Sequence, residues 1–112
     1  MRYKTINLKE DLPTVALALA TLEIEIGVAK LEGIEALKII HGYGSHGVGG
    51  EIKKALRIWL INSKRKHIIR DYVKGEQWLG SATAEKIKKA CPEVLGDSEL
   101  FYANPGVTIL LL

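Results

Sequence analysis

The sequence predicts an α/β protein: a two-layer sandwich with a four-stranded mixed sheet, in the order strand, helix, strand, helix, strand, small helix, strand. Two observations predict this class. Apolar residues recur at helical spacing in two long segments, and short apolar runs bounded by glycine alternate with those segments. The chain has 112 residues, of which 47% are apolar, and this suffices for one core. We therefore expect a single domain over residues 1–112.

The first three elements are predicted from spacing and from start and stop signals. Residues 3–8 alternate as a short strand does. Residues 11–14 supply a helix start, because Asp11 can cap and a proline is tolerated in the first helical turn. The helix is expected to run to about Leu31, with Gly33 just after its end; one face carries Val15, Leu19, Leu22, Ile26 and Ala29. Residues 35–41 form a short apolar run that is typical of a buried strand.

The remaining elements follow a glycine-rich loop, since five of the 11 glycines lie in residues 42–50. A second amphipathic helix is expected from about Val48, with Ile52, Ala55, Leu56, Trp59 and Leu60 on its apolar face. Residues 67–73 are expected to form the third strand, and residues 75–82 a turn-rich connection. A short third helix should end at Pro92, and residues 107–112 should form a strand covered on both faces.

Positive charge is concentrated in the middle of the chain. Residues 1–35 carry a net charge of −2, residues 36–75 of +7 and residues 76–112 of −2, which gives +3 overall. On the second helix, Lys53, Lys54, Arg57 and Lys64 share one face. Such a face attracts polyanions, and the nucleic-acid backbone is the obvious one. The alternative is an ordinary solvated helix face.

Other classes are disfavoured by what the sequence contains. The single cysteine, Cys91, has no partner for an internal disulfide, and the N-terminal residues lack an apolar signal segment. The most apolar charge-free stretches, residues 12–22 and 107–112, are shorter than the roughly 20 residues of a membrane helix. We expect a cytoplasmic protein without a membrane span.

The glycine-rich loop matches the pattern G-x-G-x-x-G at Gly42, Gly44 and Gly47. A dinucleotide fold needs two nucleotide-binding halves and this chain has room for one, so no nucleotide cofactor is expected. Glycines followed by a helix N-terminus still favour phosphate, which can belong to a polynucleotide. His41 ends the strand before the loop and can act as a general acid or base, or else shape the loop as a structural residue. His46, inside the loop, is a phosphate contact or a spectator.

These residues carry a family resemblance. The run Ile39-Ile40-His41-Gly42-Tyr43-Gly44-Ser45, then a basic amphipathic helix, then a closing strand Gly106-Val107-Thr108-Ile109-Leu110-Leu111-Leu112, resembles the Smr (small MutS-related) domain. The resemblance implies an α/β sandwich similar to the C-terminal domain of a bacterial translation initiation factor. It also implies nucleic-acid binding, and for several members endonuclease activity on DNA or RNA. Relative to a minimal Smr domain, residues 75–104 look like an insertion.

The first strand departs from the family pattern. Smr domains usually carry Leu-Asp-x-His there, and the matching segment is Ile6-Asn7-Leu8-Lys9. Asn7 cannot act as a base or anionic metal ligand, whereas Lys9 can bind phosphate. The predicted phosphate site is therefore Lys9, Gly42, Gly44 and Ser45, with His41 as the candidate catalytic residue. Nucleic acid is expected to contact Tyr43, Lys53, Lys54, Arg57 and Lys64.

Two functions stay open at this point besides simple nucleic-acid binding: a metal-independent endonuclease that uses His41, and an interaction module whose basic face binds an acidic protein. No metal site is expected, because the histidines and Cys91 lack zinc-like spacing. Cys91 and Trp59 are expected in the core. Trp78 and Tyr43 either pack against their own loops or stack on an unpaired base.

Overall fold

The computed structural model describes residues 2–9, 14–42 and 48–112. The described residues form four strands, β1 (Tyr3–Asn7), β2 (Ala36–Ile40), β3 (Asp71–Lys74) and β4 (Val107–Leu111). They also form three α-helices, α1 (Val15–Leu31), α2 (Val48–Arg65) and α3 (Ala82–Ala90), and the short 3₁₀ helices η1 (Gly75–Gln77), η2 (Pro92–Gly96) and η3 (Ser98–Leu100). The predicted α/β class and the order of elements are confirmed.

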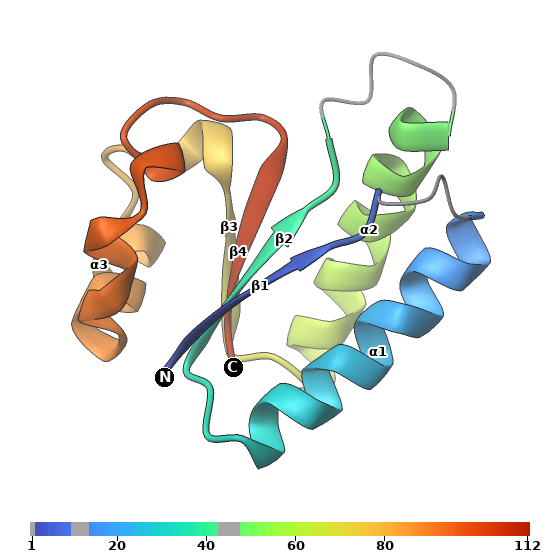
Figure 1. The fold of residues 1–112 in the computed structure, drawn as a ribbon, viewed down its shortest axis with the longest axis horizontal. Helices are drawn as coiled ribbons and strands as arrows, with labels where there is room; N and C mark the ends of the chain where they lie inside the picture. The colour runs from blue at the N-terminus through green and yellow to red at the C-terminus, as the bar shows by residue number, and fades with distance from the viewer. Residues whose placement is uncertain (1, 10–13, 43–47) are drawn as a thin grey trace.

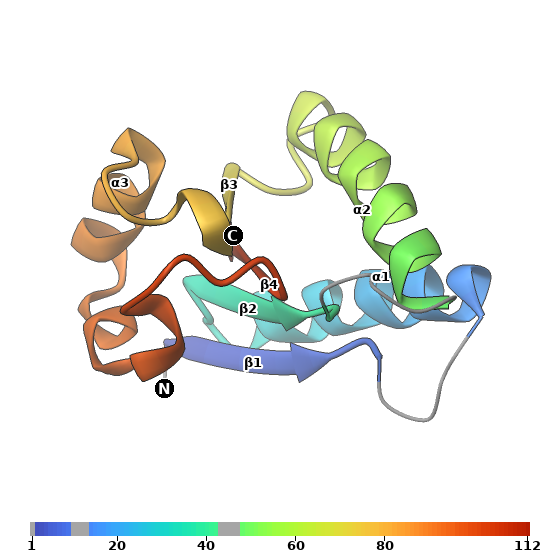
Figure 2. The same ribbon diagram turned by 90° about the horizontal axis from the view of Figure 1, so that it is seen from above.

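The sheet is mixed, as predicted, with the strand order β1-β2-β4-β3. β1 pairs with β2 in parallel, whereas β4 is antiparallel to both β2 and β3. β1, β2 and β3 therefore point in one direction and end at the same edge of the sheet (Figures 1 and 2). β4 enters the sheet at that edge.

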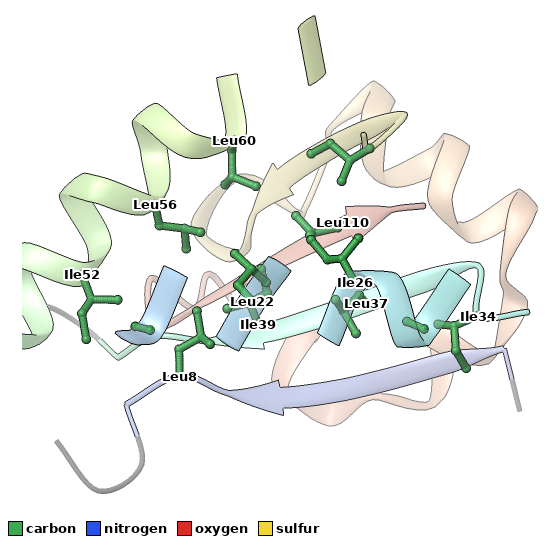
Figure 3. Close-up of a cluster of buried hydrophobic side chains, with 13 residues drawn as sticks. Leu8, Leu22, Ile26, Ile34, Leu37, Ile39, Ile52, Leu56, Leu60 and Leu110 are labelled. Atoms are coloured by element: carbon green, nitrogen blue, oxygen red, sulfur yellow. The ribbon is translucent and has the colours of Figure 1, made fainter. Parts of the chain in front are cut away.

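One face of the sheet is covered by α1 and α2, and this pair of layers is the expected sandwich. The core between them is built from Leu22 and Ile26 of α1, Leu56 and Leu60 of α2, and strand residues such as Leu37 (Figure 3). Each of these side chains is at most 3% exposed. The helical spacing of apolar residues that predicted both helices thus marks the side that each turns toward the sheet.

The opposite face of the sheet is covered as well, by residues 75–104 (Figure 2). A second core forms there, in which Trp78, Ile87, Cys91 and Val94 pack against Ile109 and other strand residues. This layer extends the predicted two-layer sandwich to a third layer, and it explains why all five residues of β4 are buried. Trp78 is 3% exposed and Cys91 fully buried, so both are core residues.

An ionic network centred on the buried Lys38 ties this second layer to the sheet. Lys38 in β2 is 3% exposed, and its ammonium contacts Asp97, at 2.8 Å, and Glu99. Tyr3 Oη also donates to Asp97, at 2.7 Å. Burial opposes the charged carboxylate of Asp97, but the hydrogen bonds from Lys38 and Tyr3 outweigh it and hold the pKa of Asp97 below its usual range.

Helix α1 ends at Leu31 as predicted, but its cap is Thr14 rather than the expected Asp11, and β3 starts later than predicted. Thr14 caps α1, since its Oγ1 accepts from Leu17 N at 3.1 Å, and Gly33 follows the helix with φ +76°. Asp11 and Pro13 lie outside the described residues. The predicted strand over 67–73 is wrong by four residues at its start, because the backbone N–H of Ile68 donates to Ser63 O at 2.9 Å and closes the end of α2 instead.

Within the described residues, no helix is both long and apolar enough to cross a membrane.

Candidate nucleic-acid interface

The ends of three strands and the start of β4 bring distant parts of the chain together. Lys9 follows β1, His41 and Gly42 follow β2, and Lys74 ends β3. Thr108 lies between the ends of β2 and β3, because it pairs with Ile39 on one side and Lys74 on the other. We call this group (Lys9, His41, Gly42, Lys74 and Thr108) the carboxyl edge.

The turn at His41 and Gly42 is held by the backbone carbonyl of Gly106, the residue just before β4. The N–H groups of His41 and Gly42 both donate to Gly106 O, at 3.0 and 3.1 Å. Gly42 has φ +82°, and a Cβ built on it would lie 3.3 Å from Cδ of Lys9. A side chain at this position would therefore be strained by the backbone and crowded by the lysine stem. Because Gly42 has no side chain, the stem of Lys9 can lie directly over the turn.

The His41 ring is buried, with 2% of the residue exposed, and both of its nitrogens have partners. Nδ1 lies 2.9 Å from Gly42 O, and Nε2 lies 2.9 Å from Thr108 Oγ1. A carbonyl can only accept, so we assign the proton to Nδ1, and the Thr108 hydroxyl donates to Nε2. Burial lowers the pKa of His41, and the nearby charge of Lys53 adds to this effect. The ring is thus neutral near pH 7 and braces the turn against β4.

Cations from separate elements surround a small cavity beside this ring. The cavity has a volume of about 10 Å³, room for one water molecule, and is lined by Lys53 and Arg57 of α2, Lys74 of β3, His41, Thr108, Glu76, Leu56 and Leu60. Glu76 Oε2 lies 3.8 Å from Lys53 Nζ. One carboxylate therefore faces three cationic side chains here. The excess positive charge lies at the carboxyl edge.

The other predicted nucleic-acid contacts lie in different places. Lys54 and Arg57 are exposed on α2. Lys64 is near the opposite end of that helix, about 16 Å from Lys53 along the axis, and its Nζ lies 3.0 Å from Asp71. Tyr43, Gly44, Ser45 and His46 lie outside the described residues.

Asp71 explains the position of Lys64. Its carboxylate is 9% exposed and also contacts Lys86 Nζ at 2.7 Å, so it joins α2 and α3 at the end of the sheet remote from the carboxyl edge. Burial opposes its charge, but the hydrogen bonds from Lys86 and Lys64 outweigh burial, and the pKa of Asp71 lies below its usual range. Lys64 is thus engaged in a structural ion pair.

Sequence reasoning missed three features of this region. Lys74 and Thr108 join the site only through the strand order. Tyr102, half exposed, borders the edge because its Oη lies 3.3 Å from Asn104 Nδ2, while Asn104 Oδ1 accepts from Gly106 N at 3.0 Å. A signal was present in the sequence, since Phe101 and Tyr102 are adjacent aromatic residues just before the turn sequence Asn104-Pro105-Gly106.

Among the described residues, no group of three or more histidine, cysteine, aspartate or glutamate side chains lies close enough together to hold a metal ion.

Comparisons with known proteins bear on the fold and on the family separately. The crystal structure of the Smr domain of Thermus thermophilus MutS2 matches with a TM-score of 0.59 and 21% identity, covering 97% of this chain and 96% of that one. The comparison with curated proteins gave no match. The family model of the Smr domain matches residues 11–88, which is most of the chain and includes the His41-Gly42 turn and all of α2. The chain therefore belongs to the Smr domain family.

Proposed function

We propose that this protein binds nucleic acid, and that its carboxyl edge contacts the phosphate backbone of the nucleic acid. The observation that carries the proposal is the convergence of Lys9, Lys53, Arg57 and Lys74, from three different segments, around one tight turn. The Smr family is associated with nucleic-acid binding and nuclease activity, which agrees with this assignment.

The chemistry of these groups suits a polyphosphate chain better than a single small anion. Lysine and arginine side chains on separate elements present several charges along a surface, and each neutralised phosphate releases condensed counterions. The predicted phosphate contacts Gly42, Gly44 and Ser45 belong to the same proposal, as do Tyr43 and Lys54. The remote Lys64 is expected to contribute little, because Asp71 already neutralises it.

We propose binding without cleavage as the primary activity. A general base must offer a lone pair to the group that it deprotonates, and Nε2 of His41 already accepts from Thr108. Asn7 and Lys9 occupy the first-strand positions where the family usually has an aspartate and a histidine, and neither supplies a carboxylate or imidazole. In this proposal His41 positions the turn rather than the reacting atoms.

The test is a binding titration with labelled single-stranded and duplex DNA and RNA over a series of salt concentrations. Arg57→Glu and Lys74→Glu are expected to weaken binding to every sequence and to lower the log–log salt slope by about 0.9 per lost contact on duplex and about 0.7 on single strands. Lys89→Glu is the matched control, since this exposed lysine lies on α3, on the other face of the sheet. Equal effects of all three substitutions, or unchanged slopes, would contradict the site.

The same samples separate the two alternatives. Incubated with magnesium or with chelator, the labelled strands should stay intact; cleavage that disappears in His41→Ala would establish the endonuclease instead. Failure of the wild-type protein to bind any of the nucleic acids at low salt would favour an acidic protein partner.

A further inference from the structure

Helix α1 is apolar on the side that faces away from the molecule as well as on the side that faces the sheet. Its inner side buries Ala18, Leu22, Ile26 and Ala29. Its outer side exposes Leu17 by 58%, Ile24 by 66%, Val28 by 40% and Leu31 by 91%. A helix at the surface of a globular protein normally turns a polar face to water. The outer side of α1 therefore has the character of a surface that is covered in a complex.

The exposed residues follow the spacing of a helix-pairing seam. Leu17, Thr21, Ile24, Val28 and Leu31, which we call the outer stripe, are separated by four, three, four and three residues. This spacing of 3.5 residues keeps a stripe in line with a second helix along its whole length. Ala20 and Gly27, both exposed, flank the stripe and allow close approach of another backbone.

The stripe carries no charge, and the charged side chains of the same helix are held elsewhere. Glu25 and Glu32, the latter just past the helix end, contact Lys4 Nζ at 3.5 and 2.9 Å. Glu23 accepts from Trp59 Nε1 at 3.3 Å, and Lys30 donates to Ile68 O. The outer stripes of two copies could therefore pack together without repulsion between facing charges.

The order of residues also makes the stripe complementary to itself. Leu17 precedes Ile24 by seven residues, and Leu31 follows it by seven. An antiparallel pair of α1 helices with Ile24 on the twofold axis would place each Leu17 against Leu31 of the second copy. A twofold contact requires this correspondence, because each patch is used twice.

We propose that α1 is the contact surface of an antiparallel homodimer, with the outer stripe of each copy packed against that of the other. α1 has 17 residues and is thus about 25 Å long. One helix face of that length buries less than the roughly 800 Å² per partner of a standard interface. The dimer is accordingly weak and forms in a concentration-dependent way, with dissociation in the micromolar range or above.

The test is the molar mass by sedimentation or light scattering from about 1 µM to about 1 mM, the range of weak complexes. The wild-type protein is expected to pass from 12.4 kDa to twice that mass. Ile24→Glu should weaken the dimer at least about tenfold, because it places two carboxylates at the centre of an apolar contact. Leu95→Glu is the matched control: Leu95 is 57% exposed but lies on η2, beyond the sheet, and its substitution should leave the equilibrium unchanged.

Both substitutions replace exposed residues, and the melting temperature checks that each variant is folded. A wild-type protein that stays monomeric over the whole range overturns the proposal, as does a dimer that Ile24→Glu leaves intact. The orientation is tested by mild oxidation of cysteine variants. Leu17→Cys mixed with Leu31→Cys should form a cross-linked dimer, whereas cross-linking of Leu17→Cys with itself would show a parallel pair and overturn the antiparallel arrangement. The native Cys91 is buried and leaves the comparison unaffected.

Discussion

His41 resembles a catalytic residue in the sequence, but its hydrogen bonds are those of a structural residue. A histidine beside a glycine-rich loop can be either a general acid or base or a structural residue, because the sequence does not reveal what its ring nitrogens contact. In the structure, Gly42 O and Thr108 Oγ1 occupy both nitrogens. The residue therefore fixes the distance between the turn and β4.

Replacement of Thr108 by valine should show the strength of this brace. Valine has nearly the same shape but cannot donate, so Nε2 of His41 is left buried without a partner. We expect the free energy of unfolding to fall by about 1–3 kcal/mol in urea titrations. Thr5→Val is the matched control, since Thr5 is exposed on β1, and should change stability by less than about 0.5 kcal/mol. Equal effects of the two substitutions would contradict the brace.

The lowered pKa of His41 predicts a pH dependence of stability. The unfolded chain binds a proton at this residue near pH 6.5, whereas the folded protein does so only at a lower pH, because burial disfavours the charged ring. Between these two values the unfolded state holds more protons, so the free energy of unfolding decreases as the pH falls from about 7.5 to 5.5. The slope should approach at most about 1.4 kcal/mol per pH unit and should flatten in His41→Gln. Urea titrations at each pH measure it, and an unchanged slope in the variant would assign the effect to other groups.

At the scale of elements, α2 has two ends with different tasks. Its cations share one face, as the helical spacing predicted, yet Lys53 and Arg57 line the cavity at the carboxyl edge while Lys64 contacts Asp71. In the proposed function, one amphipathic pattern thus serves both binding and packing. The pattern itself does not distinguish them, because it contains no information on which strand lies beneath each turn.

The segment that leads into β4 makes a separate prediction at this scale. Tyr102 is half exposed and held beside the edge through Asn104, so its ring can stack on an unpaired base next to a bound phosphate. Tyr102→Ala should weaken binding to single strands by about 1–3 kcal/mol, roughly 5- to 150-fold, and leave blunt duplex binding and the salt slope unchanged. Tyr102→Phe keeps the ring and should bind almost normally. Anisotropy titrations with both strand types check this, and an equal loss on duplex would show that Tyr102 acts on the fold instead.

At the scale of the whole molecule, two cores share one sheet. The core under α1 and α2 is apolar and its ion pairs, such as Lys64–Asp71, lie at its borders, whereas the second layer is also tied to the sheet by the buried Lys38, which contacts Asp97 and Glu99. Removal of one partner from such a group leaves uncompensated charge in the interior. The second layer should therefore depend on Lys38 more strongly than the first does.

Lys38→Met tests this coupling with the two tryptophans as reporters. Trp59 packs against the first core and Trp78 lies in the second. Trp78→Phe therefore leaves Trp59 as the probe of the first core, and Trp59→Phe leaves Trp78 as the probe of the second. We expect Lys38→Met to cost about 3–5 kcal/mol and the Trp78 signal to change at lower urea than the Trp59 signal. Without Lys38→Met, the two single-tryptophan proteins should unfold together. Coincident transitions in the Lys38→Met proteins would show that the sheet couples both layers fully.

The sequence by itself determined the class of fold, the order and type of the elements, the basic face of α2 and the His-Gly turn that marks the family. These are local properties, set by side-chain periodicity and by residues that start or stop a helix, and they can be recognised within a few turns of chain. The tertiary structure alone decided the strand order, the start of β3, which segment forms the second covering layer, and the placement of Lys74 and Thr108 beside His41 and of Tyr102 beside Asn104. It also decided that Lys64 pairs with Asp71 and that one side of α1 is left apolar in water. Each of these depends on which distant segments touch, and burial, hydrogen-bond partners and charge pairing exist only once those contacts have formed.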